Sequence, residues 1–149
     1  EAHGEQESLQ NRQILIAEDD PDNARLLSHV LGKFGAIPTV VTDGQSAIDR
    51  VHQSLTDPTP FDAILMDINI PLKDGVTATQ EIRRLGFQGP MIALTAVATP
   101  AMRDQCLQAG CDDFLSKPYR GDTLRILLER HLLIRNWRKA NVEGVQMWE

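Results

Sequence analysis

Short aliphatic runs alternate with longer amphipathic segments throughout residues 13–132, and this alternation limits the possible folds more than any other feature. The five runs are QILIA (13–17), IPTVV (37–41), FDAILM (61–66), PMIALT (90–95) and the less apolar DFLS (113–116). Continuous apolar runs of this length are typical of strands buried on both faces of a parallel sheet. Parallel strands need right-handed crossovers, which place helices on both faces. The pattern therefore predicts an α/β fold, a doubly wound five-stranded parallel sheet with helices on both faces.

The amphipathic segments carry signals for where helices begin and end. In segment 21–34 the apolar residues share one helical face; they are Leu26, Leu27, Val30, Leu31 and Phe34. Asp20 is a suitable N-cap, and Gly35 suits the left-handed residue that ends a helix. The same signals predict helices that open at Asp43-Gly44, Asp74-Gly75 and Thr99-Pro100, the last two closing at Gly86 and Gly110. A fifth helix is expected from Gly121 to about His131.

The two ends of the chain lack this pattern. Residues 1–12 are polar and without periodicity, so we interpret them as a linker or tail, with the folded domain at 13–132. The C-terminal extension, 133–149, contains both tryptophans and could extend the fifth helix, pack back on the domain or meet another domain. Because the chain starts with Glu1 rather than Met, we expect it to be a piece of a longer polypeptide.

Charge and cysteine content exclude several classes of function. The chain has 15 Lys and Arg against 21 Asp and Glu, a net charge of −6, which disfavours binding to nucleic acid or to an anionic membrane. No apolar run approaches the ~20 residues that span a bilayer, and no secretory signal is visible. Cys106 and Cys111 lack the spacing of a zinc site or a disulfide framework. We therefore expect reduced thiols in a cytoplasmic protein, whose parent chain could still be anchored in a membrane.

Polar residues follow four of the five aliphatic runs. They are Glu18, Asp19 and Asp20 after the first, Asp67 and Asn69 after the third, Thr95 at the end of the fourth, and Lys117 after the fifth. The carboxyl ends of parallel strands share one edge of the sheet, where such folds bind ligands. Carboxylates that converge there repel one another unless a cation compensates, and Mg²⁺ is the simplest hard cation for oxygen ligands. A carboxylate nucleophile, a metal, a lysine and a hydroxyl are together what an aspartyl phosphate requires.

Each residue has a simpler interpretation when taken alone. Asp20 is explained as a helix cap, which leaves Glu18 and Asp19 as the acids of the edge. Taken singly, Thr95 is an ordinary threonine at a strand end, and Lys117 is an ordinary surface lysine. Asp67 is harder to explain, because it ends an apolar run. The joint placement of these groups after different strands is what favours a site.

Four segments resemble the receiver domain of response regulators and hybrid sensor histidine kinases. They are ILIAEDDPDN (14–23), ILMDINIPLKDG (64–75), IALTA (92–96) and AGCDDFLSKP (109–118), in the family's order. The spacings also fit, with 48 residues from Asp19 to Asp67, 28 from there to Thr95 and 22 more to Lys117. The resemblance covers about 13–132 and implies a flavodoxin-like (βα)5 fold. It also implies that the chain accepts a phosphoryl group from a phosphohistidine and then switches a protein-interaction surface.

The resemblance implies that Asp67 is the phospho-acceptor and that Mg²⁺ is the cofactor. Asp19 would bind the metal directly, Glu18 directly or through water, and Asn69 through its backbone carbonyl, together with Asp67 itself. We expect no enzymatic activity beyond self-phosphotransfer and autodephosphorylation.

A second group of residues would bind the phosphoryl group and change conformation when it is present. Lys117 would pair with the phosphoryl oxygens, and Thr95 would turn its hydroxyl toward them, assisted by the Ala96 backbone N–H. Phe114 occupies the family's switch-aromatic position; as it lacks a tyrosine hydroxyl, we expect it to be buried even without phosphate. Pro118 is a candidate for a cis peptide bond after the lysine.

The expected partners are a histidine kinase or histidine phosphotransfer domain upstream, and a protein or intramolecular domain downstream. A module of a hybrid sensor kinase is favoured over a stand-alone regulator, with no contact to nucleic acid or membrane. The rival hypothesis is a small Mg²⁺-dependent phosphohydrolase of the haloacid-dehalogenase type, but Asp20-Pro21-Asp22-Asn23 lacks the final residue of that motif. A nucleotide-binding flavodoxin-like module would need a glycine-rich loop after the first run, which is missing.

Overall fold

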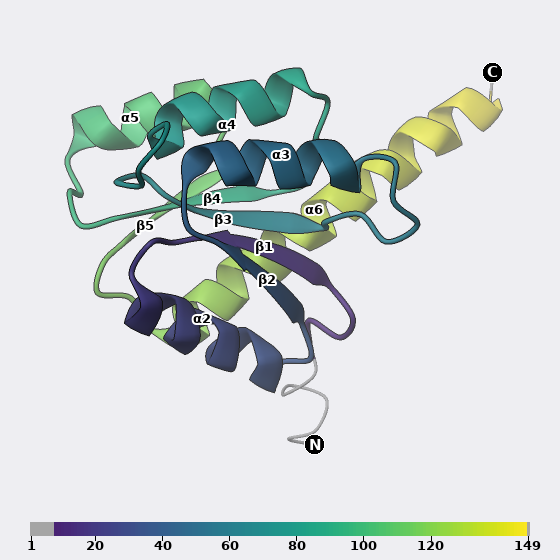
Figure 1. Cartoon of the computed structure of the whole chain (residues 1–149). Helices are drawn as coiled ribbons and strands as arrows, with labels where there is room; N and C mark the ends of the chain where they lie inside the picture. The colour runs from purple at the N-terminus through teal and green to yellow at the C-terminus, as the bar shows by residue number, and fades with distance from the viewer. Residues whose placement is uncertain (1–7, 149) are drawn as a thin grey trace.

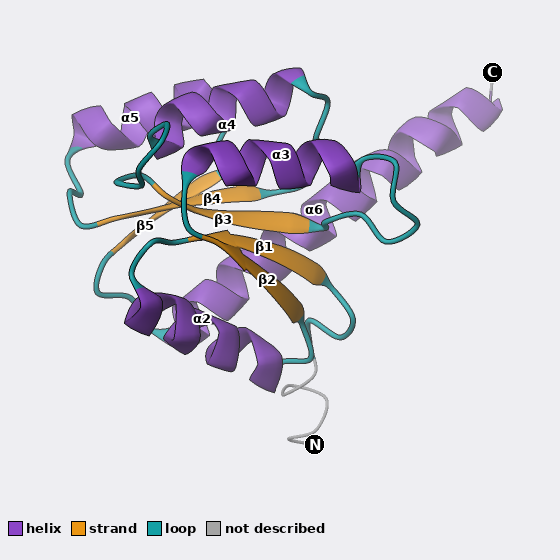
Figure 2. Ribbon diagram, in the orientation of Figure 1, coloured by secondary structure: helices purple, strands orange, loops and turns teal. Residues whose placement is uncertain are grey.

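A computed structural model describes residues 8–148, with side chains as far as residue 138. One parallel sheet has the strand order β2-β1-β3-β4-β5. The strands are β1 (Gln13–Ala17), β2 (Ile37–Val41), β3 (Ala63–Asp67), β4 (Met91–Thr95) and β5 (Asp113–Ser116). The helices are α2 (Pro21–Lys33), α3 (Gly44–Ser54), α4 (Gly75–Arg84), α5 (Pro100–Ala109) and α6 (Gly121–Trp148). The predicted doubly wound sheet is confirmed, and Figure 2 shows its alternation of strands and helices.

Helices cover both faces of the sheet, as Figure 1 shows, with α3, α4 and α5 on one face and α2 and α6 on the other. Successive strand residues point to opposite faces, so β1 sends Leu15 into one apolar cluster and Ile14 and Ile16 into the other. Both faces of β1, β3 and β4 are therefore buried, which explains why these strands are apolar without alternation, whereas the edge strands β2 and β5 are partly exposed.

The order of the strands reverses at β1, because β2 lies on one side of it and β3 on the other. The chain leaves β1 toward α2 and leaves β3 toward α4, which lie on opposite faces. In open α/β sheets, ligands bind outside the carboxyl ends of the strands at such a point of reversal, which here lies between β1 and β3. Polar residues that follow these two strands are thereby placed side by side.

Helix termini follow the local sequence signals closely. Asp20, Asp43, Asp74 and Thr99 each accept a backbone N–H as N-caps, and Gly35, Gly86 and Gly110 have positive φ at helix ends. Gly75 has a different reason to be glycine. A Cβ there would lie 2.6 Å from the carbonyl oxygen of Asp67 and 2.7 Å from the Cα of Ile68. Only a glycine lets α4 begin this close to the end of β3.

Residues 8–12, which the sequence pattern assigns to a linker or tail, contact the folded domain, while residues 1–7 lie outside the described part. Leu9 is 1% exposed and belongs to the apolar cluster under α2 and α6. Its backbone N–H donates to the carbonyl of Phe34 at 2.8 Å. A single leucine in a polar stretch has no periodicity, so the sequence pattern could not reveal this contact.

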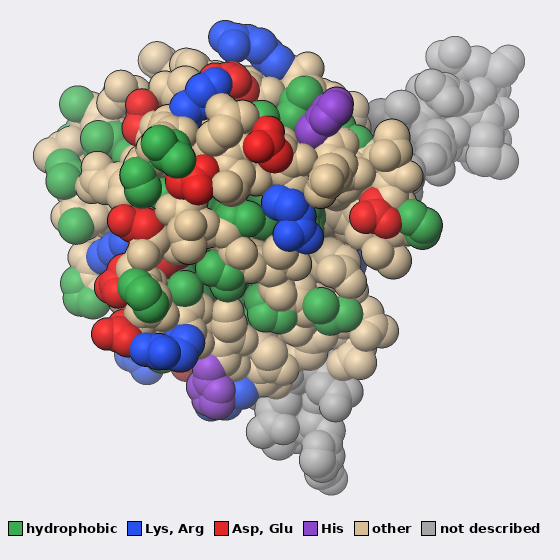
Figure 3. All heavy atoms as spheres, in the orientation of Figure 1, with side chains coloured by type: hydrophobic (Ala, Val, Ile, Leu, Met, Phe, Trp, Pro, Cys, Tyr) green, Lys and Arg blue, Asp and Glu red, His purple; other side chains and the backbone are tan. Residues whose placement is uncertain are grey.

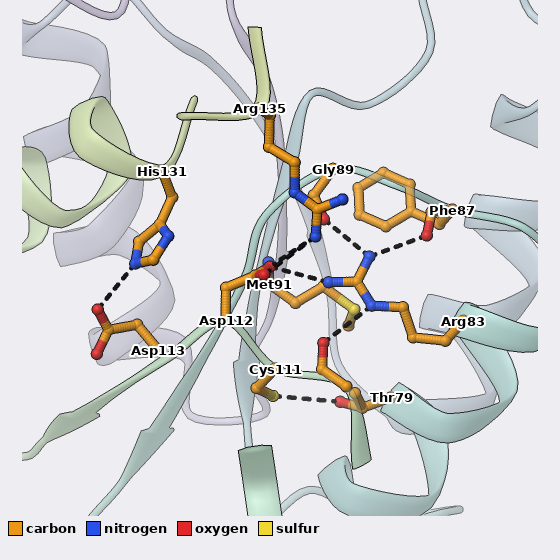
Figure 4. Close-up of polar contacts among 11 residues, drawn as sticks. Thr79, Arg83, Phe87, Gly89, Met91, Cys111, Asp112, Asp113, His131 and Arg135 are labelled. Atoms are coloured by element: carbon orange, nitrogen blue, oxygen red, sulfur yellow. Dashed lines mark hydrogen bonds and ion pairs between the residues drawn. The ribbon is translucent and has the colours of Figure 1, made fainter. Parts of the chain in front are cut away.

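Helix α6 does not end near His131 but continues to Trp148, so of the three alternatives for 133–149 the structure shows an extension of the helix. Figure 1 shows the extension running past the edge of the sheet. A hydrogen bond and an ion pair fix α6 to the start of β5: His131 Nε2 lies 2.8 Å from Asp113 Oδ2, and Arg135 pairs with Asp112 at 3.0 Å (Figure 4). Within the described residues, no helix is both long enough and apolar enough to cross a membrane.

Candidate functional site

Three acidic side chains meet at the carboxyl ends of β1 and β3. Glu18 and Asp19 follow β1, Asp67 ends β3, and one carboxylate oxygen from each lies within 4.8 Å of the others. Glu18 and Asp67 are buried, with 1% and 3% exposure, whereas Asp19 is exposed. Figure 3 shows several acidic side chains on the side of the molecule where the strands of Figure 1 end. Three carboxylates at this distance need a cation, and their oxygens are the donors that Mg²⁺ prefers.

Burial and the neighbouring Asp67 carboxylate raise the pKa of Glu18. The backbone N–H of Asp20, which donates to Glu18 Oε2 at 3.1 Å, and the charge of Lys117 act in the opposite direction. The raised pKa shows that the site resists a full set of negative charges when no metal contributes. A divalent cation would relieve this cost directly.

Lys117 provides the positive charge that the protein itself brings to the cluster. Its Nζ lies 2.8 Å from Asp67 Oδ2 and 3.3 Å from Glu18 Oε1, across 50 and 99 residues of sequence. Burial alone would lower the pKa of Lys117, but the hydrogen bonds and charges of the two carboxylates outweigh it, so the pKa is raised. The ammonium group therefore stays charged. The peptide bond from Lys117 to Pro118 is cis.

The backbone after β3 folds back over the buried carboxylate. The N–H of Asn69 donates to Asp67 Oδ1 at 3.0 Å, while the other oxygen accepts from Lys117. Asn69 thus lies in the turn that holds Asp67. This arrangement orients the carboxylate with one oxygen toward each neighbour.

Thr95 ends β4, and Phe114 lies within the neighbouring strand β5. Thr95 is buried at the end of β4, and its hydroxyl accepts from the Val97 N–H at 3.0 Å. Its carbonyl accepts from the Lys117 N–H at 2.7 Å, which ties β5 to β4, and Ala96 next to it is exposed. Phe114 is half-buried against the apolar cluster beneath α3, α4 and α5, so it is less enclosed than expected.

Tyr119 was missed by the sequence reasoning. Its ring packs against the apolar cluster on the α2 and α6 face, and burial together with the charges of Glu18 and Asp67 raises its pKa. The tyrosine therefore keeps its proton beside the acidic site. Its position two residues after Lys117, at the same strand end, was the available signal.

A sequence profile of the response regulator receiver domain matches residues 14–129. The chain belongs to this family. Hybrid signal transduction histidine kinase M of Dictyostelium discoideum is 38% identical over 122 residues, 78% of this chain and 5% of the relative. Transcription factor SKN7 of Candida albicans is 40% identical over 120 residues, 80% of this chain and 21% of that protein. The chain thus spans about a fifth or less of the length of these relatives.

A solved structure connects the receiver family to the metal. The receiver domain of sensor histidine kinase PA1611 from Pseudomonas aeruginosa is 39% identical, with a TM-score of 0.73, and the match covers 82% of this chain and 98% of that one. That structure contains a magnesium ion coordinated in the active-site cleft. In this chain the cluster of Glu18, Asp19 and Asp67 offers three carboxylate oxygens for a metal ion at the carboxyl ends of β1 and β3. The chain is a phospho-acceptor module of two-component signalling.

Proposed function

We propose that Asp67 is the residue that is phosphorylated, and that its phosphodonor is the phosphohistidine of a histidine kinase or histidine phosphotransfer domain. The observation that carries this assignment is the position of Asp67, which belongs to the acidic cluster and also contacts Lys117 at 2.8 Å. A carboxylate oxygen of Asp67 forms a bond to phosphorus while the phosphorus–nitrogen bond of the phosphohistidine breaks, and the imidazole leaves with its electron pair. Lys117 donates a hydrogen bond to this carboxylate and so holds it in place for the transfer.

The proposed metal ligands are Glu18, Asp19, Asp67 and the backbone carbonyl of Asn69. These groups would hold Mg²⁺, which would supply positive charge beside the transferring phosphoryl oxygens. The three acids contribute a fixed negative charge that Lys117 only partly offsets, so the residues present fit a divalent cation. Asp19, as the exposed acid, lies where a metal can arrive from solvent.

Four residues are proposed to recognise the phosphorylated state. Lys117 transfers its contact from Asp67 to the phosphoryl oxygens, and the hydroxyl of Thr95 turns from Val97 toward them, joined by the Ala96 N–H. Because Lys117 and Thr95 share a backbone hydrogen bond, movement of one strand end affects the other. Phe114 is proposed to follow this movement, which biases the surface of residues 98–108 and 120–129 between two states.

The larger protein is proposed to be a hybrid sensor histidine kinase, with a stand-alone regulator as the second possibility. Support comes from the similarity to hybrid and sensor histidine kinases. The domain is proposed to extend to residue 132, with 133–149 as a helical connection to the next element and a downstream protein or intramolecular domain as its partner. The cytoplasm is the proposed compartment, because Cys106 and Cys111 are free thiols.

Intact-mass measurement after incubation with acetyl phosphate and Mg²⁺ tests the assignment. One phosphoryl adduct is expected on the wild-type chain and none on Asp67→Asn. Asp20→Asn is the matched control, because Asp20 lies at the same edge but caps α2, and its adduct should persist. A phosphoryl adduct that survives in Asp67→Asn would overturn the proposal. If the adduct is instead lost in Asp20→Asn, and the wild-type chain releases phosphate from small phosphoesters, the phosphohydrolase hypothesis would be supported.

A further inference from the structure

Two consecutive residues in the loop that follows Asp67 have a backbone conformation that residues with a side chain rarely adopt. Leu72 has a φ of 54° and Lys73 a φ of 105°. Non-glycine residues enter this region only at a cost in conformational energy, and they stay there only where the surrounding structure enforces it. The neighbours of the loop, which joins β3 to α4, must therefore hold it in this shape.

The neighbour on one side is Gly44, the first residue of α3. Its backbone N–H donates to the carbonyl of Pro71 at 3.0 Å. A Cβ on Gly44 would overlap the carbonyl oxygen of Lys73 and would lie 2.9 Å from its carbonyl carbon. The carbonyl groups on either side of Leu72 thus both lie against the first turn of α3.

This contact also stabilises the start of α3. The first N–H groups of a helix have no acceptor within the helix, and they carry a partial positive charge. Asp43 accepts the N–H of Ser46 at 2.6 Å, and the carbonyl of Pro71 accepts that of Gly44. The helix start and the loop therefore hold each other, and only a glycine at position 44 lets them approach this closely.

Helix α4, which lies beside α3 on the same face of the sheet (Figure 1), holds the loop from the other side. Lys73 Nζ lies 2.8 Å and 2.6 Å from the two carboxylate oxygens of Glu81 on α4. The N–H of Gly75 donates to the carbonyl of Ile68 at 2.9 Å and closes the loop at its base. An atom inserted between the loop and α3 must therefore displace loop backbone rather than the end of a flexible side chain.

The same loop backbone carries groups of the phosphorylation site. The N–H of Asn69 donates to Asp67 Oδ1 at 3.0 Å, and the carbonyl of Asn69 is one of the proposed metal ligands. Pro71, whose carbonyl binds Gly44, lies only two residues further along the chain. A displacement of Pro71 therefore passes through a single residue, Ile70, before it reaches the peptide group of Asn69.

We propose that Gly44 is a positioning residue of the phosphorylation site. By letting α3 begin against Pro71 and Lys73, it fixes the loop that carries the carbonyl of Asn69. The inference rests on the proposed function, in which this carbonyl is a ligand of Mg²⁺. Groups that orient a metal ligand without touching the metal commonly change metal affinity by about 10–100-fold when they are replaced. Gly44→Ala should therefore raise the Kd for Mg²⁺ by about tenfold.

An NMR titration of the whole chain with Mg²⁺ tests the proposal, with the Asn69 amide as the reporter. Gly44→Ala should shift this amide resonance even without metal, and the titration should give the higher Kd. The Mg²⁺ concentration for half the maximal rate of phosphorylation by acetyl phosphate should rise by the same factor. Gly121→Ala is the matched control, because it adds a methyl group to the first residue of α6, where the nearest atom is a methyl of Val30 at 3.1 Å. It should leave the Kd unchanged.

A double variant separates positioning from a general loss of stability. Lys73→Gly removes the Cβ that would lie 3.1 Å from the one added at Gly44, and glycine adopts a positive φ without strain. Combined with Gly44→Ala, it should restore part of the Mg²⁺ affinity. The double variant also supplies the measurement if Gly44→Ala alone does not fold, and its Kd should still exceed that of the wild type.

Three results would overturn the proposal. They are a folded Gly44→Ala chain with the wild-type Kd for Mg²⁺, equal changes in Gly44→Ala and Gly121→Ala, and a double variant that binds Mg²⁺ no better than Gly44→Ala. With any of these, a wild-type chain that binds Mg²⁺ and is phosphorylated on Asp67 would leave the proposed function intact. A wild-type chain that does neither would contradict the proposed function, and this inference with it.

Discussion

Replacement of Lys117 by methionine removes the cation that contacts both buried carboxylates while keeping the length of the side chain. Its ammonium lies 2.8 Å from Asp67 and 3.3 Å from Glu18, and at an effective dielectric constant of about 20 these pairs attract by about 6 and 5 kcal/mol. Desolvation cancels much of this, and removal of one member of a buried ion pair costs about 3–5 kcal/mol. Because 23% of the Lys117 side chain is exposed, we expect a loss of about 3 kcal/mol, the lower end of that range.

Urea unfolding at pH 7, followed by circular dichroism with and without Mg²⁺, measures this loss. The metal binds the folded site and stabilises it by about 2.7 kcal/mol when its concentration is about a hundred times its Kd. Since Lys117→Met leaves the acids less neutralised, the variant should bind Mg²⁺ more tightly and gain more stability from it than the wild type. Lys73→Met is the matched control, because Lys73 pairs with Glu81 at the surface, and it should cost less than about 1 kcal/mol.

The pH dependence gives a second measurement of the same site. The folded-state pKa of Glu18 is raised above its unfolded value, so the folded state binds the extra proton. This contribution to stability is fully present below the unfolded pKa of 4.5 and is lost as pH rises through the folded pKa. Without metal, Lys117→Met should enlarge that loss. A cost below about 1 kcal/mol for Lys117→Met, with no added benefit from Mg²⁺, would refute the electrostatic reasoning.

Two further predictions concern close packing and thiol chemistry. Gly75→Ala places a Cβ against the backbone of Asp67 and Ile68, so it should lower the free energy of unfolding by about 2–3 kcal/mol in urea and slow phosphorylation. Gly32→Ala, whose Cβ meets nothing within 4 Å inside α2, should instead stabilise by up to about 1 kcal/mol; equal effects would contradict the role given to Gly75. Burial raises the pKa of Cys111 to about 12, so iodoacetamide at pH 8 should label this thiol only after unfolding. Rapid labelling of Cys111 in the native protein, detected by mass spectrometry, would contradict this prediction.

The order and the ends of the secondary-structure elements could be predicted from the sequence, because their determinants are local. An aliphatic run of five residues specifies a strand, buried on both faces in β1, β3 and β4, and Asp74 caps α4 through the N–H of Thr77, three residues away. The acids of the site were found for the same reason, since each directly follows such a run. Burial of Leu9 and the length of α6 were not found, because one depends on a contact with Phe34 and the other on a helix without a stop signal.

Only the tertiary structure decided which side chains meet. The reversal of strand order at β1 brings Glu18 beside Asp67, and the return of β5 carries Lys117 to both, across 99 and 50 residues. Tyr119 beside the acids, and Thr95 bonded to Val97, follow from that same convergence. A sequence pattern specifies which face of an element is buried and where the element ends, whereas a contact between distant residues exists only once the sheet has fixed the position of every strand end.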